Sequence, residues 1–135
     1  MPKRTPDARE LLPLTPVVLH ILLALAEREP DESMGKHGYA VAQEVETMTD
    51  GQIRMGPGTL YGSIQRMLAS SLIEEVSRGK QGTRGRSSHS DEDERRRYYR
   101  LTALGHRVLE LEVARLAQVV RIARAKRLLR EPEPA

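Results

Sequence analysis

Cysteine, tryptophan and phenylalanine are all absent from the 135 residues of this chain. Without cysteine, the chain has no disulfide framework, no thiol nucleophile and no cysteine-ligated zinc site. Its hydrophobic content of 39% is still enough to build one modest core without such links. We therefore expect one folded domain with an appendage, and a cytoplasmic location.

Long apolar runs are absent as well. The longest, residues 21–26, is far shorter than the roughly 20 residues that cross a bilayer, so we expect no membrane span. The first seven residues hold two prolines and an early acid, which is not the order of a signal peptide. We expect a flexible N-terminal tail over residues 1–14 and a short tail over residues 131–135.

Catalytic and metal-binding patterns are missing too. The four histidines are dispersed, and no two of them have the HxxxH or HExxH spacing of a metal site. Ser88, His89 and Asp91 are neighbours, but their polar surroundings could not hold a catalytic geometry. The glycine-rich run at 79–85 lacks the order of a phosphate-binding loop. The sequence therefore predicts no enzyme, no metal and no cofactor.

The net charge says little, because 22 basic and 19 acidic residues give only +3. The distribution of charge is more informative. Eight basic and four acidic residues lie between Arg78 and Arg100. This segment is therefore locally basic and contains a run of four consecutive acidic residues at 91–94.

Three compact helices are expected in the first half of the chain. A Thr-Pro start and an almost wholly apolar run predict a buried helix over residues 15–28. Proline and glycine predict a loop over 29–36. Amphipathic spacing predicts a second helix over 38–49, a brief extended piece at 52–55 and a third helix over 56–71.

Two strands and one long helix follow. Residues 72–76 and 97–101 have the composition of strands, and the polar, glycine-rich run 79–94 that separates them is typical of a flexible hairpin tip. The last helix, residues 103–130, would be about 40 Å long and would overrun the core. Its apolar seam therefore needs a partner. The seam residues are Leu109, Val113, Leu116, Val120 and Ala123.

Three helices followed by a β-hairpin form a layout in which the third helix enters a major groove and the hairpin reaches phosphates. We therefore expect a mainly α fold with a small β-wing. A winged helix-turn-helix domain would occupy residues 15–102, and a C-terminal dimerisation helix residues 103–130. Two copies would present their third helices to half-sites about 34 Å apart on double-stranded DNA.

The third helix offers polar side chains that suit DNA. Gly58 and Gly62 would let its backbone approach closely, and the amides at its start suit a phosphate. Its hydroxyl and long polar side chains could reach phosphates or base edges. Alternatively, they form the solvated face of a core helix. The candidates are Thr59, Tyr61, Ser63, Gln65 and Arg66.

The hairpin supplies the second group of candidates. Arg95, Arg96 and Arg97 could neutralise phosphates, so DNA binding would weaken steeply with salt. The alternative is a charge-rich solvated loop. DNA would repel the acids at 91–94, so the tip would swing away or pair with the arginines.

Three stretches closely resemble the signature of the PadR-like transcriptional regulators. They are HGYAVA at 37–42, GPGTLY at 56–61 and RYYRLTALG at 97–105. The resemblance spans roughly residues 16–108, and the order and spacing of all three stretches make it specific.

This resemblance implies a winged helix-turn-helix repressor that dimerises through its C-terminal helix and binds an inverted-repeat operator. It also implies a response to a small aromatic or xenobiotic effector, as is common in the family. It places Gly56, Thr59 and Tyr61 at the DNA backbone, and Tyr39 and Tyr99 where the family braces the fold or touches phosphate.

The sequence departs from the family pattern in places. Gly56 replaces a common serine and Gly62 a common proline, while the loop at 30–36 and the wing tip are longer than usual. Without Trp or Phe, an aromatic effector would have to contact tyrosine, methionine or aliphatic side chains. The alternative function is a winged-helix adaptor that binds proteins without sequence-specific DNA binding, and salt dependence would distinguish the two.

Overall fold

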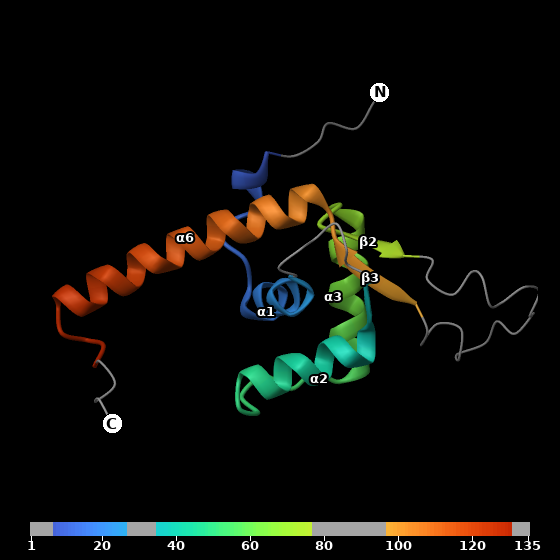
Figure 1. Cartoon of the computed structure of the whole chain (residues 1–135), viewed down its shortest axis with the longest axis horizontal. Coiled ribbons are helices and arrows are strands. Elements are labelled where there is room, and N and C mark those ends of the chain that lie inside the picture. Colours follow the sequence, from blue (N-terminus) through green and yellow to red (C-terminus); the bar gives the residue numbers. More distant parts are fainter. Residues whose placement is uncertain (1–6, 27–34, 77–96, 131–135) are drawn as a thin grey trace, which may run out of the picture.

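The computed structural model describes residues 7–26, 35–76 and 97–130 of the chain (Figure 1). It is mainly helical, with a small three-stranded antiparallel sheet, and it confirms the predicted winged helix-turn-helix class. None of the helices in these ranges has the length and apolarity of a membrane span. The elements are η1 Ala8–Leu11, α1 Pro16–Leu25, β1 Lys36–His37, α2 Gly38–Met48, α3 Pro57–Ala69, β2 Ile73–Val76, β3 Tyr98–Leu101 and α6 Ala103–Ala125.

Short local signals start the helices. The Thr15 side chain accepts a hydrogen bond from the backbone N–H of Val18 at the start of α1. The Thr102 hydroxyl likewise accepts from the N–H of Gly105 at the start of α6, at 2.9 Å. Threonine in this position satisfies an amide that the helix itself leaves without a partner. Both starts agree with the sequence prediction.

The sheet has the strand order β1-β3-β2. The wing strands β2 and β3 pair antiparallel, and Glu75 lies opposite Tyr99. The other edge of β3 pairs with β1, where the sequence predicts a loop. The predicted extended piece at 52–55 instead belongs to no strand. A two-residue strand is too short to show the alternation of apolar and polar residues that marks a strand in a sequence. Its residues are extended because they pair with the free edge of β3.

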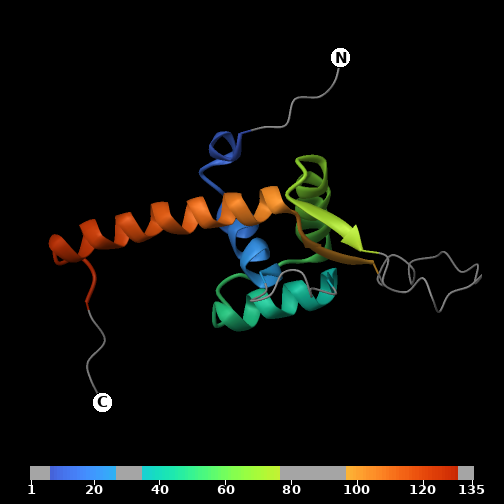
Figure 2. The same cartoon turned by 45° about the horizontal axis from the view of Figure 1, so that its top comes forward.

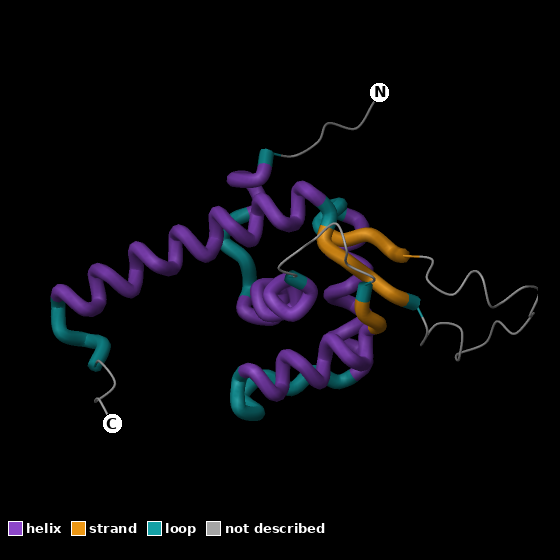
Figure 3. The backbone as a smooth tube through the Cα atoms, viewed as in Figure 1, coloured by secondary structure: helices purple, strands orange, loops and turns teal. Residues whose placement is uncertain are grey.

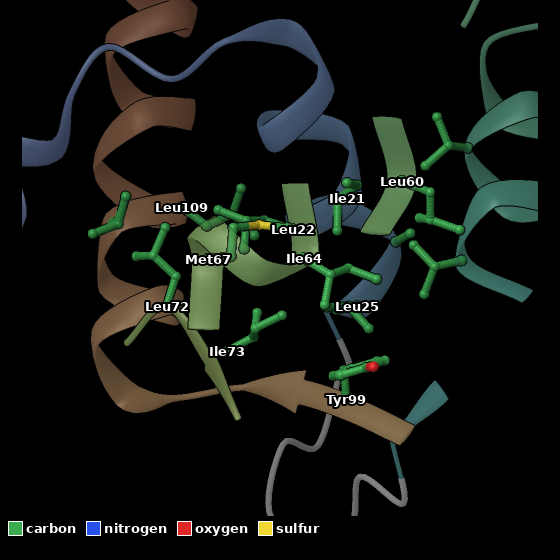
Figure 4. Close-up of a cluster of buried hydrophobic side chains, with 14 of the residues drawn as sticks. Ile21, Leu22, Leu25, Leu60, Ile64, Met67, Leu72, Ile73, Tyr99 and Leu109 are labelled. Atoms are coloured by element: carbon green, nitrogen blue, oxygen red, sulfur yellow. The ribbon is translucent and has the colours of Figure 1, made fainter. Parts of the chain in front are cut away.

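Helix α1 is the centre of the core, as its apolar sequence predicts. Ile21, Leu22 and Ala24 have no exposed surface. In two views of the chain, α1 lies between α6 and α2 (Figures 1 and 2). Figure 4 shows its side chains packed with those of α3, the sheet and the first turns of α6. This packing attaches α3 and the wing strands β2 and β3 to the same core.

The N-terminal segment is more ordered than the sequence prediction. Residues 8–14 were expected in a flexible tail, yet Ala8–Leu11 form η1, which packs against α6. Leu11, Leu12 and Leu14 are partly buried against the core. The free energy gained by burying these leucines outweighs the conformational entropy that the segment loses when it is ordered.

A buried carboxylate ties this segment to α6. The Glu112 side chain is only 1% exposed, and its Oε2 accepts a hydrogen bond from the Leu14 N–H at 3.0 Å. Arg115 donates to the same carboxylate from Nε, at 2.6 Å, and from Nη2, at 3.1 Å. These hydrogen bonds from Arg115 hold the pKa of Glu112 below its usual range, against the opposing effect of burial.

Replacing Glu112 by glutamine should lower the free energy of unfolding by about 1 to 2 kcal/mol at neutral pH, because the charged acceptor of three hydrogen bonds is lost. Folding lowers the pKa of this carboxyl, so its contribution is present above the pKa of the unfolded chain and is lost as the pH falls through that of the folded chain. The difference between variant and parent should therefore shrink between about pH 5 and pH 3. Urea denaturation across this range measures it, and a difference that does not vary with pH would contradict the assignment.

Helix α6 ends at Ala125, five residues before the predicted end. Arg127 has a left-handed backbone, with φ of 61°, and the N–H of Leu128 bonds the carbonyl of Ala123 at 2.8 Å. This pattern of hydrogen bonds is a Schellman motif, which ends a helix by satisfying its last carbonyl groups. This helix end is hard to predict from the sequence, because the left-handed residue of such a motif is usually glycine and here it is Arg127.

Candidate nucleic-acid interface

The first turn of α3 is open to solvent. Gly56, Gly58 and Thr59 are all exposed. A methyl group added at Gly56 or Gly58 would meet no atom within 4 Å. No side chain caps the start of α3, so its first amides have no side-chain partner there. Such amides, with the positive end of the helix dipole, suit a phosphate group.

The remaining candidates on α3 divide by burial. Gln65 and Arg66 are exposed, and Tyr61 is half-buried against the core. Ser63 is only 1% exposed, and its Oγ accepts a hydrogen bond from Nη2 of Arg66 at 3.2 Å. The prediction of Ser63 as a DNA contact is therefore wrong. Ser63 lies three residues after the buried Leu60, on the face of α3 that packs into the core.

The two tyrosines assigned by resemblance lie in opposite environments. Tyr39, the second residue of α2, is 62% exposed. Tyr99 is only 3% exposed and lies among the core side chains in Figure 4. Successive residues of a strand face opposite sides of the sheet, and β3 turns Tyr99 inward. The burial of Tyr99 therefore agrees with the bracing role that the resemblance allows, while Tyr39 stays a candidate DNA contact.

The base of the wing carries two ion pairs between its strands. Nε of Arg97 lies 3.4 Å from a carboxylate oxygen of Glu75, and Nε of Arg100 lies 2.7 Å from Glu74. The Arg97 side chain is 46% exposed, so its guanidinium can still meet a phosphate. The arginines stand out in the sequence, whereas their pairing with Glu74 and Glu75 depends on the register of the two strands. Arg95, Arg96 and the loop at 79–94 lie outside the described residues.

The start of α2 joins the wing to the helices. The His37 ring contacts the Tyr98 ring edge-on, with 5.5 Å between centroids. Lys36 Nζ lies 2.6 Å from the Ala24 carbonyl oxygen of α1 and 2.6 Å from Oε1 of Glu44 on α2. Figure 3 shows β1, the start of α2 and the two wing strands at one end of the molecule. Sequence reasoning assigned no role to Lys36 and His37, although His37 opens one of the signature stretches.

Beyond the core, the C-terminal half of α6 extends away from the other described elements (Figure 2), and several of its apolar side chains are exposed. Val113 and Val120 are 45% and 37% exposed, while Leu116 and Ala123 are half-buried. Leu109, also predicted in the dimer seam, is only 6% exposed because it packs in the core of its own protomer. The seam prediction is therefore wrong for Leu109. Val119 and Ile122 are exposed too, which the predicted seam did not include.

Comparisons with known proteins agree with this architecture. A family model described as the transcriptional regulator PadR-like family matches residues 22–111. The structure is similar to that of a transcriptional regulator from Clostridium thermocellum, with 19% sequence identity and a TM-score of 0.56. That match covers 81% of this chain and 90% of the other, and shows a shared fold. Comparison with curated proteins gives no match.

Proposed function

The chain belongs to the PadR-like family of transcriptional regulators, and we propose that it is a dimeric repressor that binds an inverted-repeat operator through α3 and the wing. The open first turn of α3 carries this proposal. It offers uncapped amides and no obstructing side chain at Gly56 and Gly58. A helix start of this kind can come within hydrogen-bond distance of a phosphate.

The residues of the proposed interface would make two kinds of contact, one with the DNA backbone and one with base edges. Thr59 and Tyr61 would donate hydroxyl hydrogen bonds to the backbone beside the α3 amides, and Tyr39 would do so from α2. Gln65 and Arg66 are exposed neighbours that lie between one and two turns further along α3, and they would reach base edges in the major groove. Arg95, Arg96 and Arg97 would contact phosphates from the wing. Phosphate contacts set the position of the protein and base contacts set its specificity.

A homodimer would bury the exposed side chains of α6. Val113 and Val120 lie on the same side of the helix as Leu116 and Ala123, since they are spaced by three and four residues. Helices with this spacing pair side by side and remove the apolar stripe from water. The dimer would present two copies of α3 to successive turns of the duplex.

Release by a ligand is the part of the proposal that rests on the family alone. A small aromatic or xenobiotic effector bound between α1 and α6 would release the operator. Without Trp or Phe, the chain would hold such a ligand with tyrosine, methionine and aliphatic side chains.

One observation favours the second candidate, a winged-helix adaptor that binds proteins. Both arginines at the base of the wing already have glutamate partners, Glu75 for Arg97 and Glu74 for Arg100. These pairs reduce the charge that the wing offers to DNA. An adaptor would show neither a steep salt dependence nor a twofold footprint.

Replacing Arg96 and Arg97 together by alanine should weaken binding to all DNA sequences by a similar factor, because phosphates carry no sequence information. The slope of log K against log salt should fall by about one to two. Gln65→Ala should instead change the preferred sequence at one position of each half-site and leave the slope unaltered.

Fluorescence anisotropy over a series of salt concentrations measures both effects. Arg107→Ala is the matched control, because Arg107 is an exposed arginine on α6, outside the proposed interface. Binding by the double variant equal to that of the parent would show that the wing does not contact DNA. Binding that does not respond to salt in the parent itself would favour the adaptor.

A further inference from the structure

Gly38 leaves a space that the Tyr61 side chain fills. Gly38 is the first residue of α2 and is buried. A Cβ atom at Gly38 would lie 2.9 Å from Cε1 of Tyr61, 2.9 Å from its hydroxyl oxygen and 3.1 Å from Cζ. Carbon atoms in optimal contact are about 3.5 to 4.0 Å apart. The phenol of Tyr61 therefore occupies a position that exists only because residue 38 has no side chain.

The backbone at Gly38 does not itself require glycine. Its φ lies outside the left-handed range, in contrast to Gly35 and Gly51, which have φ of +83° and +81°. Alanine is also a better helix former than glycine. The contact with Tyr61 is thus the reason that the structure offers for glycine at this position.

If a methyl group is added, the tyrosine must move and the backbone of α2 stays in place. On one side of Gly38, β1 is paired with β3, and Lys36 Nζ reaches both Ala24 and Glu44. On the other side, the His37 side chain accepts a hydrogen bond from the N–H of Ala40, which anchors the first turn. The phenol of Tyr61 is the far end of a half-buried side chain and can swing toward solvent.

We propose that Gly38 is a positioning residue for DNA binding: it lets the Tyr61 phenol lie against the start of α2, and so sets where its hydroxyl meets the operator. This inference rests on the proposed function, in which Tyr61 contacts the DNA backbone. The contact also links α2 to α3, since Gly38 is the first residue of α2 and Tyr61 lies on α3.

The test compares Gly38→Ala in the parent and in a Tyr61→Ala background. In the parent, Gly38→Ala should change the urea midpoint little, because the higher helix propensity of alanine offsets the packing that the displaced ring loses. It should weaken operator binding about tenfold, the worth of one well-placed hydrogen bond. In the Tyr61→Ala background there is no ring to displace, so Gly38→Ala should change affinity less than about twofold. An equal loss in both backgrounds, or no loss in the parent, overturns the proposal.

A measurement without DNA separates this inference from the proposed function. The chain has four tyrosines and no Phe or Trp, so a carbon–proton NMR spectrum contains few tyrosine ring signals and none from other six-membered rings. Gly38→Ala should shift the ring signals of Tyr61 and leave those of the exposed Tyr39 in place. Unshifted Tyr61 signals overturn the packing argument whether or not the protein binds an operator. If the signals shift but the parent binds no operator, the proposed function fails, and with it the DNA-binding role of Gly38.

Discussion

Gly105→Ala is expected to lower the free energy of unfolding by about 3 kcal/mol, the largest stability loss expected from an added methyl group at any glycine that the structure describes. A Cβ atom on Gly105 would lie 2.0 Å from the carbonyl oxygen of Leu72 and 3.0 Å from its carbonyl carbon. Neither group can give way easily. The Leu72 carbonyl accepts hydrogen bonds from both the N–H and the hydroxyl of Thr102, and the Leu72 side chain is 4% exposed. Relief therefore requires the first turn of α6 to separate from the start of the wing.

Gly62→Ala is the matched control, because it makes the same chemical change within a helix. A Cβ atom there meets only Nη1 of Arg66, at an ordinary 3.7 Å. This variant should be more stable than the parent by about 0.5 to 1 kcal/mol, the difference in helix propensity between glycine and alanine. Urea denaturation followed by circular dichroism measures both variants. Equal midpoints for the two would contradict the close packing of α6 on Leu72.

The second large effect is expected from charge in the α6 seam. Val113→Asp combined with Val120→Asp should convert the dimer to monomers and weaken operator binding by at least about a hundredfold. Two carboxylates buried without partners cost several kcal/mol, which a dimer interface of this kind cannot offset. A monomer also loses the gain in affinity from binding two half-sites at once. Both valines are exposed in the single chain, so its own fold should survive.

Gln118→Asp is the control for this variant. Gln118 is exposed and lies two residues before Val120, on the opposite side of the helix from the seam. The Gln118→Asp variant should therefore remain a dimer. Sedimentation velocity at micromolar concentration gives the oligomeric state directly. If the double aspartate variant still sediments as a dimer, these valines do not form the dimer interface. If the parent sediments as a monomer, the proposed dimer itself is wrong.

The sequence predicts the fold well where the signals are local. Thr15 and Thr102 mark the helix starts because a capping threonine acts within one turn of the chain. The β1 strand escapes prediction, since its two residues are extended only through their hydrogen bonds to β3. The packing of η1 on α6 escapes it for the same reason, because the leucines of residues 8–14 are buried by an element about a hundred residues away.

The elements that carry the candidate site are predictable from the sequence, and the exposure of their individual residues is less so. The signature stretches place α3 and the wing correctly, but which residues face outward depends on packing. Ser63 and Gln65 both suit DNA chemically, and only the packing of α3 shows that Ser63 is buried. Leu109 and Val113 continue one apolar spacing, and that spacing cannot tell where the protomer's own core ends and a partner would begin.

The most direct test of the central claim is selection of bound fragments from a random DNA library with the purified protein, at low and high salt. A dimeric operator binder should enrich an inverted repeat whose half-sites lie about 34 Å apart, and retention should fall steeply with salt. Salt-sensitive retention without an enriched sequence would contradict specific recognition by α3. No retention at either salt concentration would contradict DNA binding and favour the adaptor.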